Sequence, residues 1–317
     1  MKKIILILSF LTITVSVFAQ NDIQLSQQIN NRVVFNPAAT GQSGCYNFTV
    51  LDREQWTGVK DAPSTQLFNF NKYFVKAKLG IGLTLIHDRL GYERSIGAKV
   101  AIAYHAWLTD KMVLSFGIGA GILNKTLNYA ALTWDDPTEQ GIKTGKESKL
   151  SPDFDFGIEY NFKGLSIGGS TTHLITSLKK STSFKVPRHI YAYAKYAITC
   201  SPSLEIVPAL SYNNVGTVHL VEVNAMANIK DRVSAGLSYR TGINPKGKDT
   251  GLPVVGTDAL VIIAGVKVID AVRISYSYDI KMGGLKYGST KGSHELMVLC
   301  RFGCNNLDKA PHPRFFN

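Results

Sequence analysis

The fold is decided by residues 94–127, RSIGAKVAIAYHAWLTDKMVLSFGIGAGILNKTL. From Met112 to Ile122 the residues at even positions are apolar, and most of those between them are small. This period of two is typical of a strand with two different faces. Both arms are far longer than the mean soluble strand of about 5–6 residues. A tilted strand that crosses an outer membrane needs about 9–11 residues. The stretch therefore predicts two long barrel strands joined by a tight turn at residues 108–111.

The composition also indicates a membrane barrel. The chain has 317 residues, of which 45% are hydrophobic and 18% are charged. No apolar run of about 18 residues, the length of a transmembrane helix, follows the N-terminal segment. Hydrophobicity spread in alternation is the barrel pattern. The formal charge is +12, but no basic helix or aromatic-interleaved basic cluster suggests nucleic acid. We expect the basic residues in solvated loops near anionic outer-membrane lipid.

The N-terminus is predicted to be a signal peptide, residues 1–19. Lys2 and Lys3 precede an apolar core, and Ala19 offers a small residue at the cleavage site. Gln20 follows where a lipoprotein would have a cysteine. We therefore expect an exported protein that resides in the outer membrane after cleavage.

The remainder divides into three parts. We predict an N-terminal periplasmic segment at 20–44, an outer-membrane β-barrel at 45–303 and a C-terminal periplasmic tail at 304–317. The barrel is predicted to be all-β and antiparallel, with about fourteen strands, polar side chains in the lumen and apolar ones facing lipid. The predicted strands are 45–57, 65–74, 79–87, 94–108, 112–127, 152–162, 164–174, 188–199, 204–213, 217–228, 232–242, 257–268, 272–282 and 293–303.

The predicted connections sort by length. Those after even-numbered strands are short, whereas several after odd-numbered strands are long. Outer-membrane barrels have short periplasmic turns and longer outer loops. The pattern therefore places the segments 128–151, 175–187 and 243–256 outside the cell.

Four cysteines bear on barrel closure: Cys45, Cys200, Cys300 and Cys304. The exported compartment permits disulfides. In a closed barrel the first strand pairs with the last, so Cys45 is expected near Cys304. Neighbouring strands lie about 4.7–4.9 Å apart, within the reach of a disulfide. Cys45–Cys304 is the preferred bond, Cys45–Cys300 is the alternative for a shifted register, and four free thiols are the third possibility.

Motifs with catalytic or metal-binding potential have simpler explanations. Ser166 lies in a Gly-x-Ser-x-Gly pattern, but it falls inside a strand and no helix follows, as a nucleophile elbow requires. The seven histidines show no metal-binding spacing. Acidic residues of the longest loop could bind calcium but lack a known loop spacing; they are Asp135, Asp136, Glu139 and Glu147. Gly117, Gly119 and Gly121 are expected to leave room in the lumen. No catalytic, metal or cofactor site is predicted.

Several short motifs stand near the two ends of the chain. They are Leu25-Ser26-Gln27, Asn36-Pro37-Ala38-Ala39-Thr40-Gly41, Arg53-Glu54-Gln55-Trp56-Thr57-Gly58, Ala62-Pro63-Ser64-Thr65 and, in the tail, Cys304 with Pro313-Arg314-Phe315-Phe316. Together they resemble the PorP/SprF family of type IX secretion system membrane proteins from Bacteroidetes. Thr40 departs from the family, in which an aromatic residue is common before the glycine. The family positions expected to have a structural or docking role are Asn36, Pro37, Gly41, Gln55, Trp56, Gly58, Pro63, Thr65 and Arg314.

The resemblance implies a non-enzymatic outer-membrane barrel that serves protein secretion, with gliding motility in some members. It also implies export or surface anchoring of large cargo proteins, with periplasmic ring proteins and secreted cargo as partners. A passive porin or outer-membrane solute transporter of the same architecture is the alternative. A secreted soluble β-protein is a third possibility.

Overall fold

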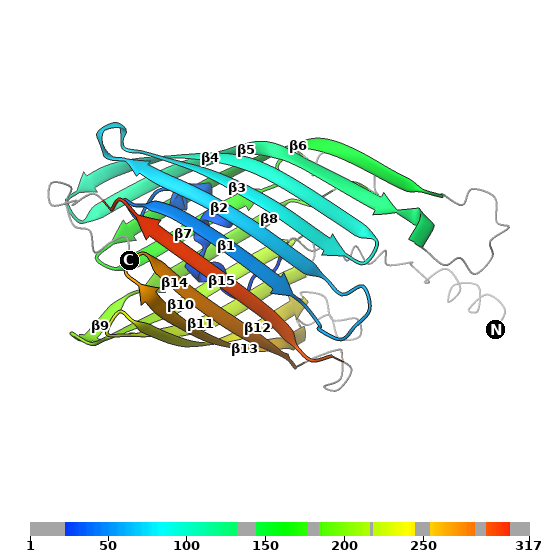
Figure 1. The fold of residues 1–317 in the computed structure, drawn as a ribbon. Helices are drawn as coiled ribbons and strands as arrows, with labels where there is room; N and C mark the ends of the chain where they lie inside the picture. Colours follow the sequence, from blue (N-terminus) through cyan, green and yellow to red (C-terminus); the bar gives the residue numbers. More distant parts are fainter. Residues whose placement is uncertain are drawn as a thin grey trace, which may run out of the picture.

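The structure, a computed structural model, describes residues 23–131, 144–175, 184, 186–215, 218–244, 254–282 and 290–304. They form a barrel of tilted antiparallel strands (Figure 1). The strands are β1 Tyr46–Glu54, β2 Ser64–Phe74, β3 Leu79–Leu90, β4 Glu93–Thr109, β5 Met112–Asn128, β6 Lys146–Phe162, β7 Leu165–Thr172, β8 His189–Tyr196, β9 Ile198–Ser201, β10 Leu204–Val215, β11 Val218–Ile229, β12 Val233–Asn244, β13 Val254–Ile269, β14 Val272–Lys281 and β15 Ser293–Phe302. The 3-10 helices are η1 Gln28–Asn30, η2 Arg32–Val34, η3 Pro37–Ala39, η4 Val75–Ala77 and η5 Tyr129–Ala131.

The barrel closes because its last strand pairs with its first. The pairing of β15 with β1 runs from Tyr46 opposite Phe302 to Glu54 opposite His294. β8 and β9 both pair with β10 and occupy one position in the ring. The 15-stranded sheet therefore fills fourteen positions, and the predicted fourteen-stranded antiparallel barrel is confirmed.

Two ends of the barrel differ in their connections. One end, here the tight-turn end, carries η4 and the connections 110–111, 163–164, 202–203, 230–232 and 270–271. The opposite, long-loop end carries the connections 55–63, 129–145, 173–188, 245–253 and 282–292, together with two short ones at 91–92 and 216–217.

Side chains alternate between a polar interior and an apolar exterior. In β6, Asp153, Asp155 and Glu159 are buried, whereas Phe154 and Phe156 are exposed. Exposed large apolar side chains recur on almost every strand, far more than a soluble monomer tolerates. The outer surface therefore suits a lipid environment. Among the described residues, no helix is long and apolar enough to cross a membrane.

Some strands extend beyond their predicted bounds. β6 begins at Lys146, six residues before the predicted start at 152, because its first residues pair with the end of β5. β13 begins at Val254 rather than 257, opposite Asn244 of β12. In both cases the added residues pair with an existing strand although they lack apolar alternation of their own.

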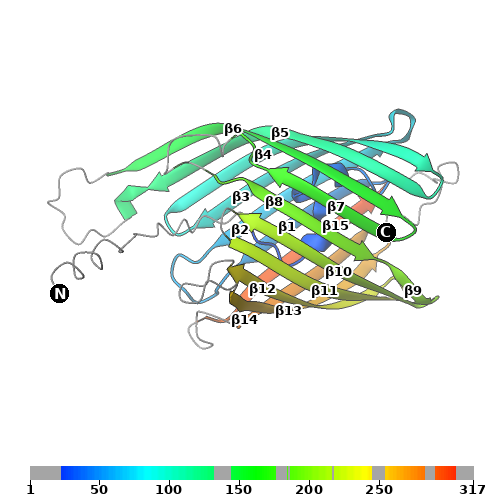
Figure 2. The ribbon, with the colours of Figure 1, turned by 180° about the vertical axis from the view of Figure 1, so that it is seen from behind.

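The N-terminal segment lies inside the barrel, so its predicted periplasmic position is wrong for residues 23–44. Both ribbon views show this segment, in dark blue, enclosed by the strands (Figures 1 and 2). It runs from Ser26, bonded to Glu295 near the long-loop end, to Thr40, bonded to His105 near the tight-turn end. We call residues 23–44 the plug. The weak periodicity of this segment predicted an exposed position. In the structure, polar side chains of the lumen instead form hydrogen bonds with its backbone.

An apolar cluster fixes the plug against one part of the lumen wall. Leu25 and Phe35 of the plug pack with buried residues of four strands, which are Leu51, Leu67, Tyr191 and Met297. The ring centroids of Phe35 and Tyr191 lie 5.0 Å apart. Most of the lumen is polar, so this cluster provides the apolar part of the contact.

A disulfide joins the residue that follows the plug to the C-terminal end of the barrel. Cys45, just before β1, is bonded to Cys304, just after β15, with Cα atoms 4.1 Å apart. Cys200 and Cys300 are free thiols. The bond lies where the barrel closes, at the tight-turn end.

Topology can be tested by tag insertion. Because the long-loop end is predicted to face outward, tags in 129–145, 175–187 or 245–253 should be reached by antibody or protease on intact cells. Tags at Thr109-Asp110 or Lys230-Asp231 should be protected until the outer membrane is permeabilised. The opposite labelling pattern would invert the orientation.

The disulfide is predicted to form in the exported protein. Mass spectrometry of an unreduced tryptic digest should show a linked peptide that contains Cys45 and Cys304 and disappears on reduction. Cys200 should be alkylated without reduction. A peptide that links Cys200 to another cysteine would contradict the strand order.

Candidate functional site: the plug and its lumen contacts

The motif at residues 36–41 folds as a capped turn that the strands recognise through its backbone and amide groups. The Asn36 side chain accepts a hydrogen bond from the Ala38 amide at 2.9 Å, and Pro37 occupies the first position of η3. This is a favourable start for a short helix. The Asn36 amide nitrogen donates to the Ile158 carbonyl at 3.1 Å and to the Tyr193 hydroxyl at 2.9 Å. One side chain thus caps the turn and binds two strands.

Glycines in three strands leave space for this turn. A Cβ atom at Gly117 would lie 2.2 Å from the Ala38 nitrogen, and one at Gly157 would lie 2.0 Å from the Asn36 side-chain oxygen. A Cβ atom at Gly80 would lie 1.9 Å from the Thr40 carbonyl oxygen. Glycine inside a strand usually marks a close backbone approach. At these positions the approaching backbone belongs to the plug.

The plug turns toward β1 at Gly41. This residue has φ +82°, and a Cβ there would lie 2.7 Å from the Gly80 Cα atom. Its amide donates to the Asn71 side chain at 3.2 Å. One residue earlier, the Thr40 carbonyl lies 2.9 Å from Nε2 of buried His105, whose Nδ1 contacts the Ser115 hydroxyl at 2.7 Å. Glycine at position 41 is therefore required both by the backbone conformation and by the lack of space.

Arg32 connects the middle of the plug to β6. Its guanidinium lies 3.3 Å from the fully buried Glu159 carboxylate and donates to the Gln42 side chain at 2.9 Å. Glu159 also accepts a hydrogen bond from the Tyr193 hydroxyl. Because Tyr193 also receives the Asn36 amide, this group ties two parts of the plug to the same wall.

A buried charge network holds the start of the plug. Glu295 accepts the backbone amides of Ser26 at 2.7 Å and Gln27 at 2.9 Å. Arg53, only 1% exposed, donates to Glu295 at 3.2 Å and to Asp279 at 2.9 Å. The Ser26 hydroxyl bridges this group, with bonds of 2.5 Å to Asp279 and from Arg53.

The network continues across the barrel wall. Arg240 donates to Asp279 at 3.2 Å and to Glu222 at 2.8 Å. The chain of charges thus joins β1, β11, β12, β14 and β15. Buried charges are stable only when each has partners and hydrogen bonds. Here the plug completes the set, because Glu295 takes two of its bonds from the plug backbone.

The family positions fall into two groups. Asn36, Pro37 and Gly41 belong to the plug, whereas Gln55, Trp56, Gly58 and Pro63 form the β1–β2 connection at the long-loop end. This hairpin is hydrogen-bonded to the residues at the start of β15. The Thr57 amide donates to the Gly292 carbonyl at 2.9 Å, and the Trp56 amide donates to the Ser293 hydroxyl at 3.2 Å. Thr65 is fully buried in β2 and bonds Asp88 at 2.5 Å. Arg314 lies outside the described residues.

None of the charged residues of this site was assigned a role from sequence. Arg53 stands inside a family motif, and Asp279 and Glu295 occupy inward positions of alternating strands. A charged residue at an inward position was the available signal. An inward position does not reveal which residue a charged side chain contacts, because the contacting residues are far apart in the chain. Ser26, for example, lies 253 residues from Asp279.

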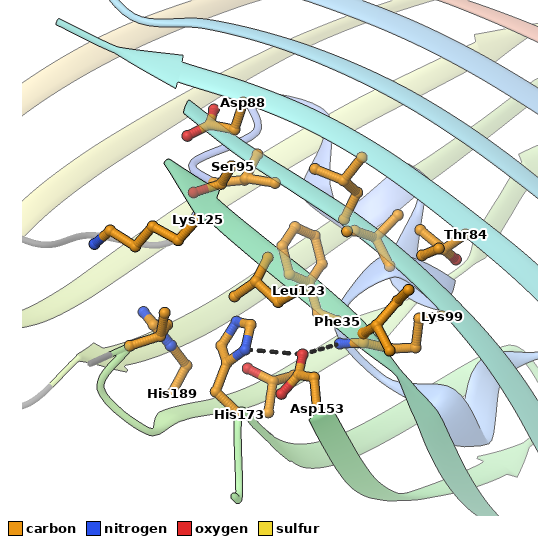
Figure 3. Close-up of a pocket in the computed structure, with 18 of the residues that line it drawn as sticks. Phe35, Thr84, Asp88, Ser95, Lys99, Leu123, Lys125, Asp153, His173 and His189 are labelled. Carbon is orange, nitrogen blue, oxygen red and sulfur yellow. Dashed lines mark ion pairs between the residues drawn. The ribbon is translucent and has the colours of Figure 1, made fainter. Parts of the chain in front are cut away.

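A small cavity of about 90 Å³ lies at the long-loop end beside the plug. Figure 3 shows Lys99 and His173 directed at Asp153, with Phe35 and Leu123 nearby. The Asp153 carboxylate is 3.1 Å from Lys99 and 2.9 Å from His173. Ligand pockets usually measure about 300–1,000 Å³. The charges balance one another, so the group is best explained as part of the lumen packing.

The other sequence motifs lie apart from the plug contacts. Ser166 lies within β7 and donates to the Asn161 side chain at 2.7 Å. Over the described part of the chain, no group of three or more histidine, cysteine or acidic residues could hold a metal ion. Asp135, Asp136 and Glu139 of the considered calcium loop fall outside the described residues.

Loss of Arg53 should destabilise the barrel. In Arg53→Met, Glu295 loses its guanidinium partner in a buried site, which costs about 3–5 kcal/mol. The midpoint temperature for unfolding in detergent, followed by the heat-dependent gel shift of the barrel, should fall clearly. Arg94→Met, at an exposed position of β4, is the control and should unfold near the wild-type temperature. Equal shifts in both variants would contradict a specific role for Arg53.

A methyl group at Gly117 should displace the plug. In Gly117→Ala the added Cβ meets plug backbone, whereas in Gly119→Ala it meets the side chains of Asp155 and Lys99 at 3.3 Å. We expect Gly117→Ala to conduct ions more than the wild type in planar bilayers, and Gly119→Ala to resemble the wild type. Unchanged conductance in Gly117→Ala, with wild-type thermal stability, would show that the plug tolerates the insertion.

Comparison with solved structures supports the fold. A mutant of the monoaromatic hydrocarbon channel TodX has a TM-score of 0.52 and 9% identity, over 85% of this chain and 93% of that chain. The outer membrane protein Omp33 of Acinetobacter baumannii has a TM-score of 0.46 and 10% identity, over 82% of this chain and all of that one. At such identities the likeness concerns the barrel architecture alone. No curated protein matches the chain.

The family comparison covers most of the sequence. Residues 17–299 match the model of the type IX secretion system membrane protein PorP/SprF. This range includes the plug motif at 36–41, the two hairpin motifs at 53–58 and 62–65, and all but the end of the last strand. The chain is a member of the PorP/SprF family of type IX secretion system membrane proteins.

Proposed function

We propose that this protein is a non-enzymatic outer-membrane component of type IX protein secretion that works as a closed scaffold for partner proteins. The observation that carries the proposal is that two family motifs build the plug and its anchor. The motif at 36–41 rests on strand glycines, and Arg53 of the motif at 53–58 holds Ser26. Family motifs in a passive channel would be expected to line an open path.

The filled lumen argues against passive transport of solutes. Water-filled porins keep a polar channel, whereas other barrels are plugged. Here residues 23–44 cross the lumen and bind it through buried ion pairs and backbone contacts. Opening this path would require breaking those contacts together. The porin alternative therefore needs a separate opening event, which a scaffold does not.

The two ends offer separate docking surfaces. In the orientation predicted from loop lengths, the tight turns face the periplasm, where ring proteins of the machinery would bind. The hairpin with Trp56 and Pro63 is at the outer end, where secreted cargo would be exported or anchored. The surrounding partner is outer-membrane lipid. A role in gliding motility follows only from membership of the family.

Deleting the gene should abolish surface delivery of one or a few large proteins and leave small-solute uptake unchanged. Complementation with Trp56→Ala or Pro63→Ala should restore the barrel, measured by its heat-dependent gel shift, but not delivery. Lys60→Ala, in the same hairpin but outside the motif, is the matched control and should restore both. If deletion lowers only solute uptake, the transporter function replaces the proposed one.

A further inference from the structure

The plug does not fill the tight-turn end of the lumen. A half-open cavity of about 440 Å³ remains there, large enough for a small organic molecule or a few peptide residues. Its lining includes residues of three tight turns, namely Gly164, Ser203 and Asp231, so it opens at that end. Its inner wall is the plug, from Ile29 to Val33.

Four basic side chains line this cavity against two acidic ones. The basic residues are Arg32, Lys195, Arg273 and Arg301, and the acidic residues are Glu205 and Asp231. Asp231 is already paired with Arg273 at 3.0 Å and also with Lys267. Glu205 accepts a bond from Asn228 at 3.0 Å. Arg32 is paired with Glu159 at 3.3 Å, so Lys195 and Arg301 remain against Glu205 alone.

Lys195 and Arg301 carry this excess. Neither makes an ion pair within 4.0 Å among the described residues. The Lys195 ammonium is repelled by the charges of Arg32 and Arg301 and attracted by those of Glu159 and Glu205, which lie beyond ion-pair distance. Moreover, Nε of Arg301 and Nε of Arg32 are buried without a hydrogen-bond partner. Buried donors without partners are costly, so such groups often mark a site for a ligand.

The arrangement suits an organic anion with more than one acidic group. Lys195 is on β8 and Arg301 is on β15, which lie six positions apart in a ring of fourteen. The two cations thus approach the cavity from nearly opposite walls. Guanidinium and ammonium groups both form strong charge-assisted bonds with carboxylates. Asn71, Ser166 and Ser43 add neutral hydrogen-bonding groups to the lining.

We propose that the cavity at the tight-turn end is a binding site for carboxylate groups, held between Lys195, Arg301 and the Arg32 side of the plug. The carboxylates belong to a free polycarboxylate or to an acidic peptide that enters from the tight-turn end. The inference does not depend on the proposed secretion role. A ligand here would contact the plug directly, through Arg32.

Calorimetric titration of the full-length barrel in detergent tests the site, with citrate in one arm and an end-blocked hexaglutamate peptide in the other. Lys195→Gln and Arg301→Gln should each weaken binding about tenfold or more. Arg301→Lys, which keeps the charge, should bind within a few-fold of the wild type. Lys111→Gln, in another tight turn outside the cavity, is the control. Binding of citrate alone identifies a small-molecule site, and binding of peptide alone identifies a peptide site.

Absence of binding in both arms would overturn the proposal, as would equal weakening in Lys111→Gln. A second measurement uses only the wild type, in case the glutamine variants fail to fold. Labelling of amines with a small reagent, followed by mass spectrometry, should show Lys195 protected by the bound ligand and Lys111 unprotected. Labelling of Lys195 that neither ligand changes would also contradict the site.

Discussion

The buried ion network around Arg53 is the interaction on which the filled lumen depends. A barrel whose inner face carries Glu295, Asp279, Arg240 and Glu222 encloses charges that need partners once water is removed. Arg53 neutralises two of them, and the plug supplies the amides that complete Glu295. Without the plug, Glu295 would keep only part of its hydrogen bonds. The same contacts therefore close the lumen and balance its buried charges.

The second constraint is steric. The turn at residues 36–41 lies so close to β3, β5 and β6 that only glycine fits beneath it at positions 80, 117 and 157. Strand glycines cost backbone entropy. That cost is offset here by close contact between plug and wall and by the hydrogen bonds that Asn36 and Thr40 make. Polar bonds to Ser26 and Gln27 at the start of the plug and the steric fit of residues 36–41 near its end define a single position for the plug.

The contents of the lumen distinguish this protein from a bare barrel wall. The barrel wall is of a common outer-membrane kind, but the contents of its lumen are built from the chain's own N-terminal segment. The plug divides the lumen into a small cavity at the long-loop end and a larger basic cavity at the tight-turn end. The wall therefore serves as a frame for a fixed internal structure, with a different surface at each end.

Alternation along the chain determined the barrel, the number of strand positions and the two faces of each strand, because the period of two is local and needs no knowledge of partners. Loop lengths likewise separated the two ends, and the family motifs identified the family. The tertiary structure alone decided where residues 23–44 lie. Their partners are hydrogen-bonding groups far away in sequence, such as Glu159, Asp279 and Glu295, and a segment without periodicity carries no sign of them. The role of three strand glycines could not be predicted either, namely that of Gly80, Gly117 and Gly157. A glycine that leaves an open lumen and a glycine that accommodates a plug look the same in the sequence. The two roles are distinguished only by the structure, in which the backbone of Ala38 lies against Gly117.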